Sequence, residues 1–167
     1  GNIGSETLGE LEAHTYELSE GANLISFPYL YENNSIANVL SSIQDDVAGM
    51  IGEGVAATLV DGEWVGSLTN VNFEDGYWLK TTNDINPTFT GCKIASNTFY
   101  DLHIGANLIS SSVYDETPIS MALPDEQEIY INGIIGEGVA ASQQGDFNWV
   151  GSLSNFELGK GYWFKTD

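Results

Sequence analysis

Arginine is absent from this chain of 167 residues, and its four basic residues, all lysines, face 24 acidic ones. The resulting formal net charge of -20 repels phosphate groups, so nucleic acids and anionic lipids are poor partners. Without arginine, the protein also lacks the planar fork that holds a carboxylate or a phosphate through two hydrogen bonds. This charge is compatible with a neutral polymer, a cation or another protein as partner, and it also favours solubility.

Cysteine and long apolar runs are equally scarce. The single Cys92 has no second cysteine for an internal disulfide and no histidine at the spacing of a metal site, so we interpret it as a small buried side chain. No run of 18 apolar residues occurs, and the sequence therefore predicts no membrane insertion.

Motifs of known catalytic chemistry are missing as well. His14 and His103 are the only histidines, and neither stands in a recognisable arrangement with a serine, cysteine or aspartate nucleophile or orienter. The chain has no phosphate-binding glycine loop, dinucleotide fingerprint or paired-cysteine motif. These absences predict a protein without catalytic residues and without enzymatic activity.

The sequence does contain a long internal repeat. Four segments of the first half return 84 or 85 residues later: 21–26 as 105–110, 51–57 as 135–141, 64–68 as 149–153, and 76–78 as 161–163. We define repeat 1 as residues 14–82 and repeat 2 as residues 99–167. Residues 1–13 are interpreted as an arm or linker, and 83–98 as a connecting segment. A unit of this length approaches a small domain that buries its own core.

The patterns within the repeats predict an α+β fold that is predominantly antiparallel β, a tandem duplicated small barrel or sandwich with pseudo-two-fold symmetry. Each repeat is expected to open with a hairpin, 15–18 with 24–27 and 99–102 with 108–111, joined by a Gly-Ala-Asn turn. A tight turn at Asp61-Gly62 is expected to join two further strands. The longer loop at 143–148 should hold the extra residue of repeat 2, and 87–94 should add a strand that binds the two halves together.

One short helix per repeat is also expected. Apolar residues at 36, 39, 40 and 43 follow the spacing of one helix face, with Ser35 as the N-cap. In repeat 2, Thr117 as cap and Pro118 at the first helical position predict a helix of one or two turns that stops at Pro124.

Glu53 and Glu137, each between two glycines, form the most interesting charged pair. Two carboxylates related by an internal two-fold would suit a hydrolase if they faced each other. The alternative is a turn whose glycines meet a backbone requirement while the glutamate points to solvent. We retain the hydrolase as the alternative function.

Repeated aromatic residues are the candidate ligand-binding side chains. They are Trp64, Trp78, Tyr77, Trp149, Trp163 and Tyr162. Successive residues of a strand point to opposite faces, so in each Tyr-Trp pair one ring belongs to the core and the other is available to a sugar ring or a protein partner. The alternative is that all six fill the core. The segment 27–31 is rich in aromatics in repeat 1 only, so a ligand face there is expected in one repeat.

No metal ligand set is predicted. Calcium is the cofactor that the hard oxygen ligands of Asp45-Asp46, Asn83-Asp84-Asn86 and Asp115-Glu116 would suit, but none of these clusters has the spacing of a calcium-binding loop. We therefore expect no cofactor and interpret the clusters as solvated loops.

The order Gly-x-Asn-Leu-Ile-Ser-x-Pro, a short helix, a glycine-rich strand, a tryptophan and a closing Gly-Tyr-Trp-x-Lys resembles accessory repeats of large secreted or surface proteins of bacteria and archaea. The resemblance covers 15–81 and 99–166, with Ser112 in place of Pro28 in repeat 2. It implies a non-catalytic, extracellular, β-rich module. We hypothesise a binding or adhesion module, or a spacer, of a larger extracellular, cell-surface or virion-surface protein, with a purely structural repeat between neighbouring domains as a further alternative. A carbohydrate (glycan) or a protein would be its ligand.

Overall fold

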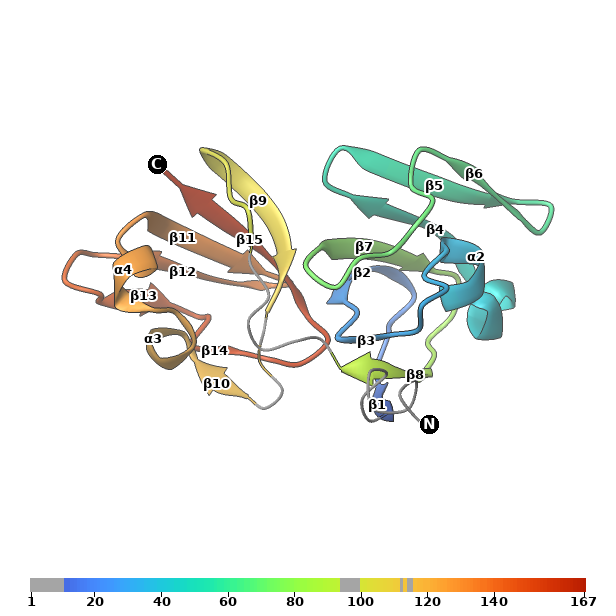
Figure 1. Cartoon of the computed structure of the whole chain (residues 1–167), viewed down its shortest axis with the longest axis horizontal. Coiled ribbons are helices and arrows are strands. Elements are labelled where there is room, and N and C mark those ends of the chain that lie inside the picture. Colours follow the sequence, from blue (N-terminus) through green and yellow to red (C-terminus); the bar gives the residue numbers. More distant parts are fainter. Residues whose placement is uncertain (1–10, 94–99, 112, 114–115) are drawn as a thin grey trace, which may run out of the picture.

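The computed structural model describes residues 11–93, 100–111, 113 and 116–167. It is rich in β-strands with a few short helices, and its sheets are antiparallel, in agreement with the predicted α+β class. Each repeat supplies one five-stranded sheet, and Figure 1 shows the two sheets side by side, with repeat 1 on the right and repeat 2 on the left.

The sheet of repeat 1 has the strand order β2-β7-β4-β5-β6. These strands are β2 (Gly21–Ser26), β7 (Gly76–Thr81), β4 (Val47–Gly52), β5 (Val55–Val60) and β6 (Glu63–Gly66). The predicted tight turn between β5 and β6 is confirmed, because Asp61 and Gly62 both have positive φ and the flanking residues pair. Met50, Leu79 and Phe27 are completely buried at the centre of the core of this repeat.

The sheet of repeat 2 has the equivalent order β9-β15-β11-β12-β13. Its strands are β9 (Gly105–Ser110), β15 (Gly161–Thr166), β11 (Ile131–Gly136), β12 (Val139–Gln143) and β13 (Trp149–Gly151). The predicted loop insertion is confirmed between β12 and β13, where Asp146 and Phe147 both have positive φ. A separate core surrounds Ile134 and Phe156. Closure of either sheet into a barrel or sandwich stays a prediction.

The helices are short in both repeats. Ser35 caps α2 (Ile36–Val39) by accepting a hydrogen bond from the Asn38 amide, which confirms the predicted cap. The predicted helix does not continue to Ile43, because a 3-10 helix, η1 (Ser41–Asp46), follows with a non-helical Ile43. In repeat 2, α3 (Ile119–Ala122) and α4 (Asp125–Glu128) flank Pro124. Thr117 is not the cap, since β10 (Thr117–Pro118) pairs there with β14 (Asn155–Phe156).

A third sheet, specific to the first half, has the order β1-β8-β3. It consists of β1 (Leu11–Thr15), β8 (Thr88–Lys93) and β3 (Tyr29–Leu30). The predicted strand in the connecting segment therefore exists, but it pairs with strands of the first half instead of binding the two halves together. The predicted arm is too long, because residues 11–13 belong to β1; residues 1–10 lie outside the described residues.

The predicted opening hairpin of repeat 1 is wrong. Its Gly-Ala-Asn segment is not a turn but the first half of β2, and β2 pairs with β7. Asn23 explains the difference: its buried side-chain amide donates to the carbonyl oxygens of Ser19 and Leu79, and its Oδ1 accepts from the Ser19 amide. Asn107 makes the same set of bonds in repeat 2 with His103 and Phe164, so the asparagine fixes the strand start in both repeats.

Turns of repeat 2 cover the free edge of β2. The amide of Leu24 donates to Oε1 of Glu137 at 2.7 Å, and the amide of Ser26 donates to the Gly159 carbonyl oxygen at 2.9 Å. The Ser26 hydroxyl donates to the Lys160 carbonyl oxygen at 2.6 Å. An uncovered strand edge presents unpaired donors and acceptors to other chains, so these bonds both join the repeats and protect the edge.

Repeat 1 covers the free edge of β9 in the same way. The amide of Leu108 donates to Oε1 of Glu53 at 2.7 Å, and the amide of Ser110 donates to the Glu74 carbonyl oxygen at 3.0 Å. We call the two covered edges, with the turns that cover them, the junction. Each repeat thus has its own core but depends on the other repeat for the cover of its edge strand.

Candidate functional site

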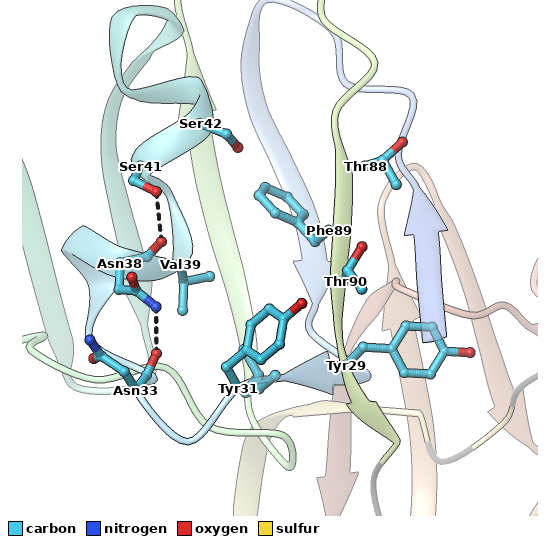
Figure 2. A pocket seen from close by; sticks show the side chains of 11 residues that line it. Tyr29, Tyr31, Asn33, Asn38, Val39, Ser41, Ser42, Thr88, Phe89 and Thr90 are labelled. Atoms are coloured by element: carbon cyan, nitrogen blue, oxygen red, sulfur yellow. Dashed lines mark hydrogen bonds between the residues drawn. The ribbon is translucent and has the colours of Figure 1, made fainter. Parts of the chain in front are cut away.

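A groove of about 340 Å³ lies between α2 and β8 of the first half. Figure 2 shows the ring of Tyr31 in its middle, with Asn33, Asn38 and Ser41 on the helical side and Thr90 on β8. The remaining lining residues are Tyr29, Leu30, Val39, Ser42, Thr88 and Phe89. We call this cavity the Tyr31 groove.

Local structure explains how the groove forms. The pairing of β3 with β8 ends at Leu30, so the chain leaves the sheet at Tyr31, whose side chain is 48% exposed. The Ser35 cap then starts α2, and the side-chain amide of Asn38 reaches back to the Asn33 carbonyl oxygen at 2.8 Å. Phe89, from β8, lines the groove and also belongs to the core of the first half.

The groove carries no charge. All its lining residues have uncharged side chains, although the whole chain has 24 acidic residues. Among the described residues, no protein partner contacts the hydroxyl groups of Tyr31, Ser42 and Thr90 through a hydrogen bond. An aromatic face beside unpaired hydroxyl groups and side-chain amides can stack on an apolar ring face and exchange hydrogen bonds with polar groups at its rim.

Comparison with known proteins adds no assignment. No protein-family model, no curated protein and no solved structure matches this chain. The resemblance to accessory repeats of surface proteins therefore stays a prediction.

Two of the six predicted aromatic ligand residues belong to the core. Tyr77 and Tyr162 are 1% and 2% exposed, and their hydroxyl groups accept hydrogen bonds from the amides of Asn72 and Glu157. Burial raises the pKa of Tyr77 well above its usual value and that of Tyr162 to about 12. Neither ring is accessible to a ligand, because each packs among core residues of its repeat.

Their neighbours Trp78 and Trp163 lie on the other face of each sheet and are partly exposed, so the predicted alternation is confirmed. Trp78 stands between Leu24 and Ile51 in the ladder, and these side chains share one face. Leu24 is completely buried, whereas Ile51 is 55% exposed. The tryptophan therefore lies at the border between the junction and solvent, and a role in ligand binding stays a prediction.

Trp64 and Trp149 lean on the cores of their repeats. The indole N–H of Trp149 donates to Oε1 of the buried Glu128, while the buried indole N–H of Trp64 has no partner within the described part of the chain. Both rings are partly buried, and a role for either in ligand binding stays a prediction. Neither tryptophan lines the Tyr31 groove.

Glu53 and Glu137 occupy two different places in the junction. Glu137 accepts from Leu24 at the edge of β2, and Glu53 accepts from Leu108 at the edge of β9. The second oxygen of Glu53 lies 2.6 Å from Nε2 of His103. The turn expected as the alternative is confirmed, because Gly54 and Gly138 both have positive φ. Both glutamates are exposed, as that alternative expects, but each also accepts a hydrogen bond from an edge amide, which the sequence did not indicate. The hydrolase alternative stays a prediction, and no contact between the two carboxylates favours it.

No metal centre can be built from the described residues. Among them, no group of three or more histidine, cysteine, aspartate and glutamate side chains could hold a metal ion. Asp46 accepts a hydrogen bond from Asn83, and Asp84 accepts one from the amide of Glu20, so these clusters serve loop structure. Asp115 of the third predicted cluster lies outside the described residues. In the described part of the chain, none of the helices has both the length and the apolar character needed to span a bilayer.

Sequence reasoning pointed to only part of the groove. The segment 27–31 was singled out because its aromatics have no counterpart in repeat 2, and it does supply Tyr29 and Tyr31. The polar side chains of Asn33 and Asn38 on the helical side, and of Thr90 on β8, were missed. The strand predicted in the connecting segment was the available signal, because a strand needs a pairing partner. That strand, β8, pairs with β3 and forms the wall opposite the helix.

Proposed function

We propose that this chain is a non-catalytic binding module, derived by tandem duplication, whose Tyr31 groove binds a neutral glycan. The observation that carries the proposal is the uncharged lining of the groove in a protein of net charge -20. Sugar rings combine apolar C–H faces with hydroxyl rims, which suit an aromatic ring flanked by amides and hydroxyl groups. A charged ligand would meet no opposite charge in the groove.

One binding site per chain is expected. Repeat 2 has the sequence Ser111-Ser112-Val113-Tyr114 where repeat 1 has Pro28 and its flanking aromatics, so its sequence supplies fewer aromatic side chains at this place. We infer that duplication left repeat 2 as the structural partner that covers the edge of repeat 1. The extracellular or surface setting, with neighbouring domains in a larger protein, is part of this proposal and rests on the resemblance described above.

The test is binding of the purified chain to an array of neutral oligosaccharides, followed by calorimetry on any sugar that binds. Tyr31→Ala should weaken binding by about fivefold or more, because a central aromatic anchor commonly contributes more than about 1 kcal/mol. The matched control is Tyr130→Ala, which removes an exposed tyrosine of repeat 2, 60% exposed and outside the groove. It should bind like the unmodified chain.

Two other outcomes would replace the proposal. If no neutral sugar binds, a purely structural spacer is favoured. If a sugar binds equally to the Tyr31→Ala variant but not to Trp78→Ala, the ligand lies on the exposed face of β7 instead of in the groove. A stoichiometry of two sugars per chain would contradict the single-site expectation.

A further inference from the structure

Both histidines of the chain lie at the junction between the repeats, although they are not equivalent in the sequence. His103 precedes β9 and contacts Glu53 of repeat 1. His14 is in β1 and contacts the turn of repeat 2 that includes Gly159 and Lys160. The two histidines of the chain thus both lie where one repeat contacts the other.

The surroundings of His103 favour its charged form. Nε2 lies 2.6 Å from Oε2 of Glu53, and Nδ1 lies 2.9 Å from the Ile104 carbonyl oxygen. Both partners are acceptors, so both hydrogen bonds exist together only when each ring nitrogen carries a hydrogen. These two hydrogen bonds raise the pKa of His103. The same carboxylate holds the Leu108 amide at the edge of β9, so the imidazolium helps to orient the group that joins the repeats.

The surroundings of His14 favour its neutral form. Its ring lies edge-on to Tyr16 at 4.7 Å, and an added Cβ on Gly159 would come within 2.6 Å of the ring, so the imidazole packs directly on that glycine. Burial and the nearby charge of Lys160 lower the pKa of His14. Protonation there would put a second positive charge beside Lys160, in the turn whose carbonyl groups accept from Ser26.

We propose that the junction is a two-sided proton sensor, tightest near neutral pH where His103 is charged and His14 is neutral, and looser on either side. The pKa of His103 is raised in the folded state. Its contribution to stability is therefore complete below the unfolded-state pKa of about 6.5 and is lost as the pH rises through the folded-state pKa. His14 has a lowered folded-state pKa. The contribution of neutral His14 to stability is complete above a pH of about 6.5, the unfolded-state pKa, and is lost as the pH falls through the folded-state pKa.

Other charged groups do not reverse these directions. On the elements around His103, Asp101 lies in its own segment, and Lys165 and Asp167 flank Thr166, whose hydroxyl donates to the His103 carbonyl oxygen. Glu53 is the charged side chain bonded to the ring, and the pair is solvent-exposed, so its effect is modest.

The elements around His14 carry few charges. Glu12 lies on its own strand, and Glu157 belongs to the turn that also contains Lys160. The partner strand β8 places the uncharged Phe89 opposite His14.

An NMR titration of the unmodified chain from pH 5 to 9 tests the proposal directly. The ring signals of His103 should titrate above the ordinary value and those of His14 below it. The Leu108 and Leu24 amides provide an internal comparison, because each donates to a glutamate, Glu53 or Glu137. His103 contacts only Glu53, and the residue equivalent to His103 in the sequence of repeat 1 is Ser19. Exchange protection of Leu108 relative to Leu24 should fall roughly two- to fivefold as His103 loses its proton.

Two variants complete the experiment. Each replaces one histidine by the residue that stands at the equivalent sequence position of the other repeat. For His103→Ser, the ratio of unfolding constants between variant and unmodified chain should be largest below pH 6.5 and shrink above it. For His14→Thr, the stability of the unmodified chain relative to the variant should increase as the pH rises. Parallel protection of Leu108 and Leu24 at all pH values, or histidines that titrate in the opposite order, would overturn the proposal.

Discussion

The carboxylate of Glu137 and the backbone amide of Leu24 are 113 residues apart in the sequence and form a hydrogen bond of 2.7 Å. Glu53 and Leu108 form the equivalent bond at the same distance. The repeated Gly-Glu-Gly segment thus has a role that is visible only between repeats: each glutamate accepts from a strand edge that its own repeat does not contain. Pairing of these edges with another molecule is prevented by the same contacts.

Replacement of Glu137 by alanine should destabilise the protein. The Leu24 amide would lose its acceptor, and the expected loss in the free energy of unfolding is about 1 kcal/mol. Glu137→Gln keeps an acceptor oxygen and should lose less. Urea unfolding at neutral pH measures both variants, with Glu63→Ala, an exposed glutamate of β6, as control. Equal stabilities of Glu137→Ala and the control would contradict the role of this hydrogen bond.

An added methyl group at Gly76 or Gly161 should push the repeats apart. A Cβ on Gly76 would lie 2.8 Å from the Ile109 carbonyl oxygen, and one on Gly161 would lie 2.7 Å from that of Ile25. The neighbour is backbone in each case, so Gly→Ala should lower the free energy of unfolding by about 1–3 kcal/mol. Thermal unfolding checks this against Gly133→Ala, where the nearest atom is 3.7 Å away. A control as unstable as the junction variants would refute the explanation.

Loss of either buried asparagine should be more severe than loss of an exposed one. Asn23→Ala removes the acceptor of the Ser19 amide and a donor to the Leu79 carbonyl oxygen, while the Ser19 carbonyl oxygen keeps the Thr81 hydroxyl as a donor. A lost hydrogen bond costs about 1 kcal/mol, so the free energy of unfolding should fall by about 1–2 kcal/mol. Asn107→Ala should behave alike. Asn148→Ala, in an exposed loop, should change the free energy of unfolding by less than about 0.5 kcal/mol. Denaturant midpoints at constant slope distinguish these outcomes.

Glu128 should be replaceable by glutamine with a gain in stability. Its side chain is 1% exposed, one carboxylate oxygen accepts from Trp149, and the other has no partner in the described residues. Glu128→Gln keeps the acceptor for the indole and removes a buried charge, so the free energy of unfolding should rise by about 1 kcal/mol. Glu128→Ala should instead lower it, because the indole loses its acceptor. If calorimetry shows the glutamine variant to be as unstable as the alanine variant, the charge itself is required.

Local patterns in the sequence were sufficient to predict the turn at Asp61-Gly62, the cap at Ser35 and the alternation of Tyr77 with Trp78. Each depends on a few adjacent residues whose backbone or burial preference is clear. The predicted hairpin at 15–27 failed because the side-chain bonds of Asn23, one to a carbonyl group 56 residues away, outweigh a local preference for a turn. Local propensity carries no information about such a contact.

The candidate site and the junction needed three-dimensional information for the same reason. Tyr31 was within a segment that the sequence marked, but its polar surroundings come from α2 and from β8, which lies almost 60 residues further along the chain. Glu53 and Glu137 were recognised as a pair in the sequence. Their hydrogen-bond partners were not, because each partner is a backbone amide, which no residue type in the sequence marks. The mixed order of strands in the sheet of repeat 1 has the same origin, since β2 pairs with the distant β7.

Because each repeat has a core of its own but receives the cover of its edge strand from the other repeat, a chain cut after β8 should yield two fragments that each keep a core but lack that cover. Mixed in equal amounts, they should reassemble into a one-to-one complex. Kept apart, each fragment would present an uncovered strand edge, which favours association with its own copies. The presence of two repeats therefore gives this protein something a single repeat cannot have: both edge strands are covered within one chain.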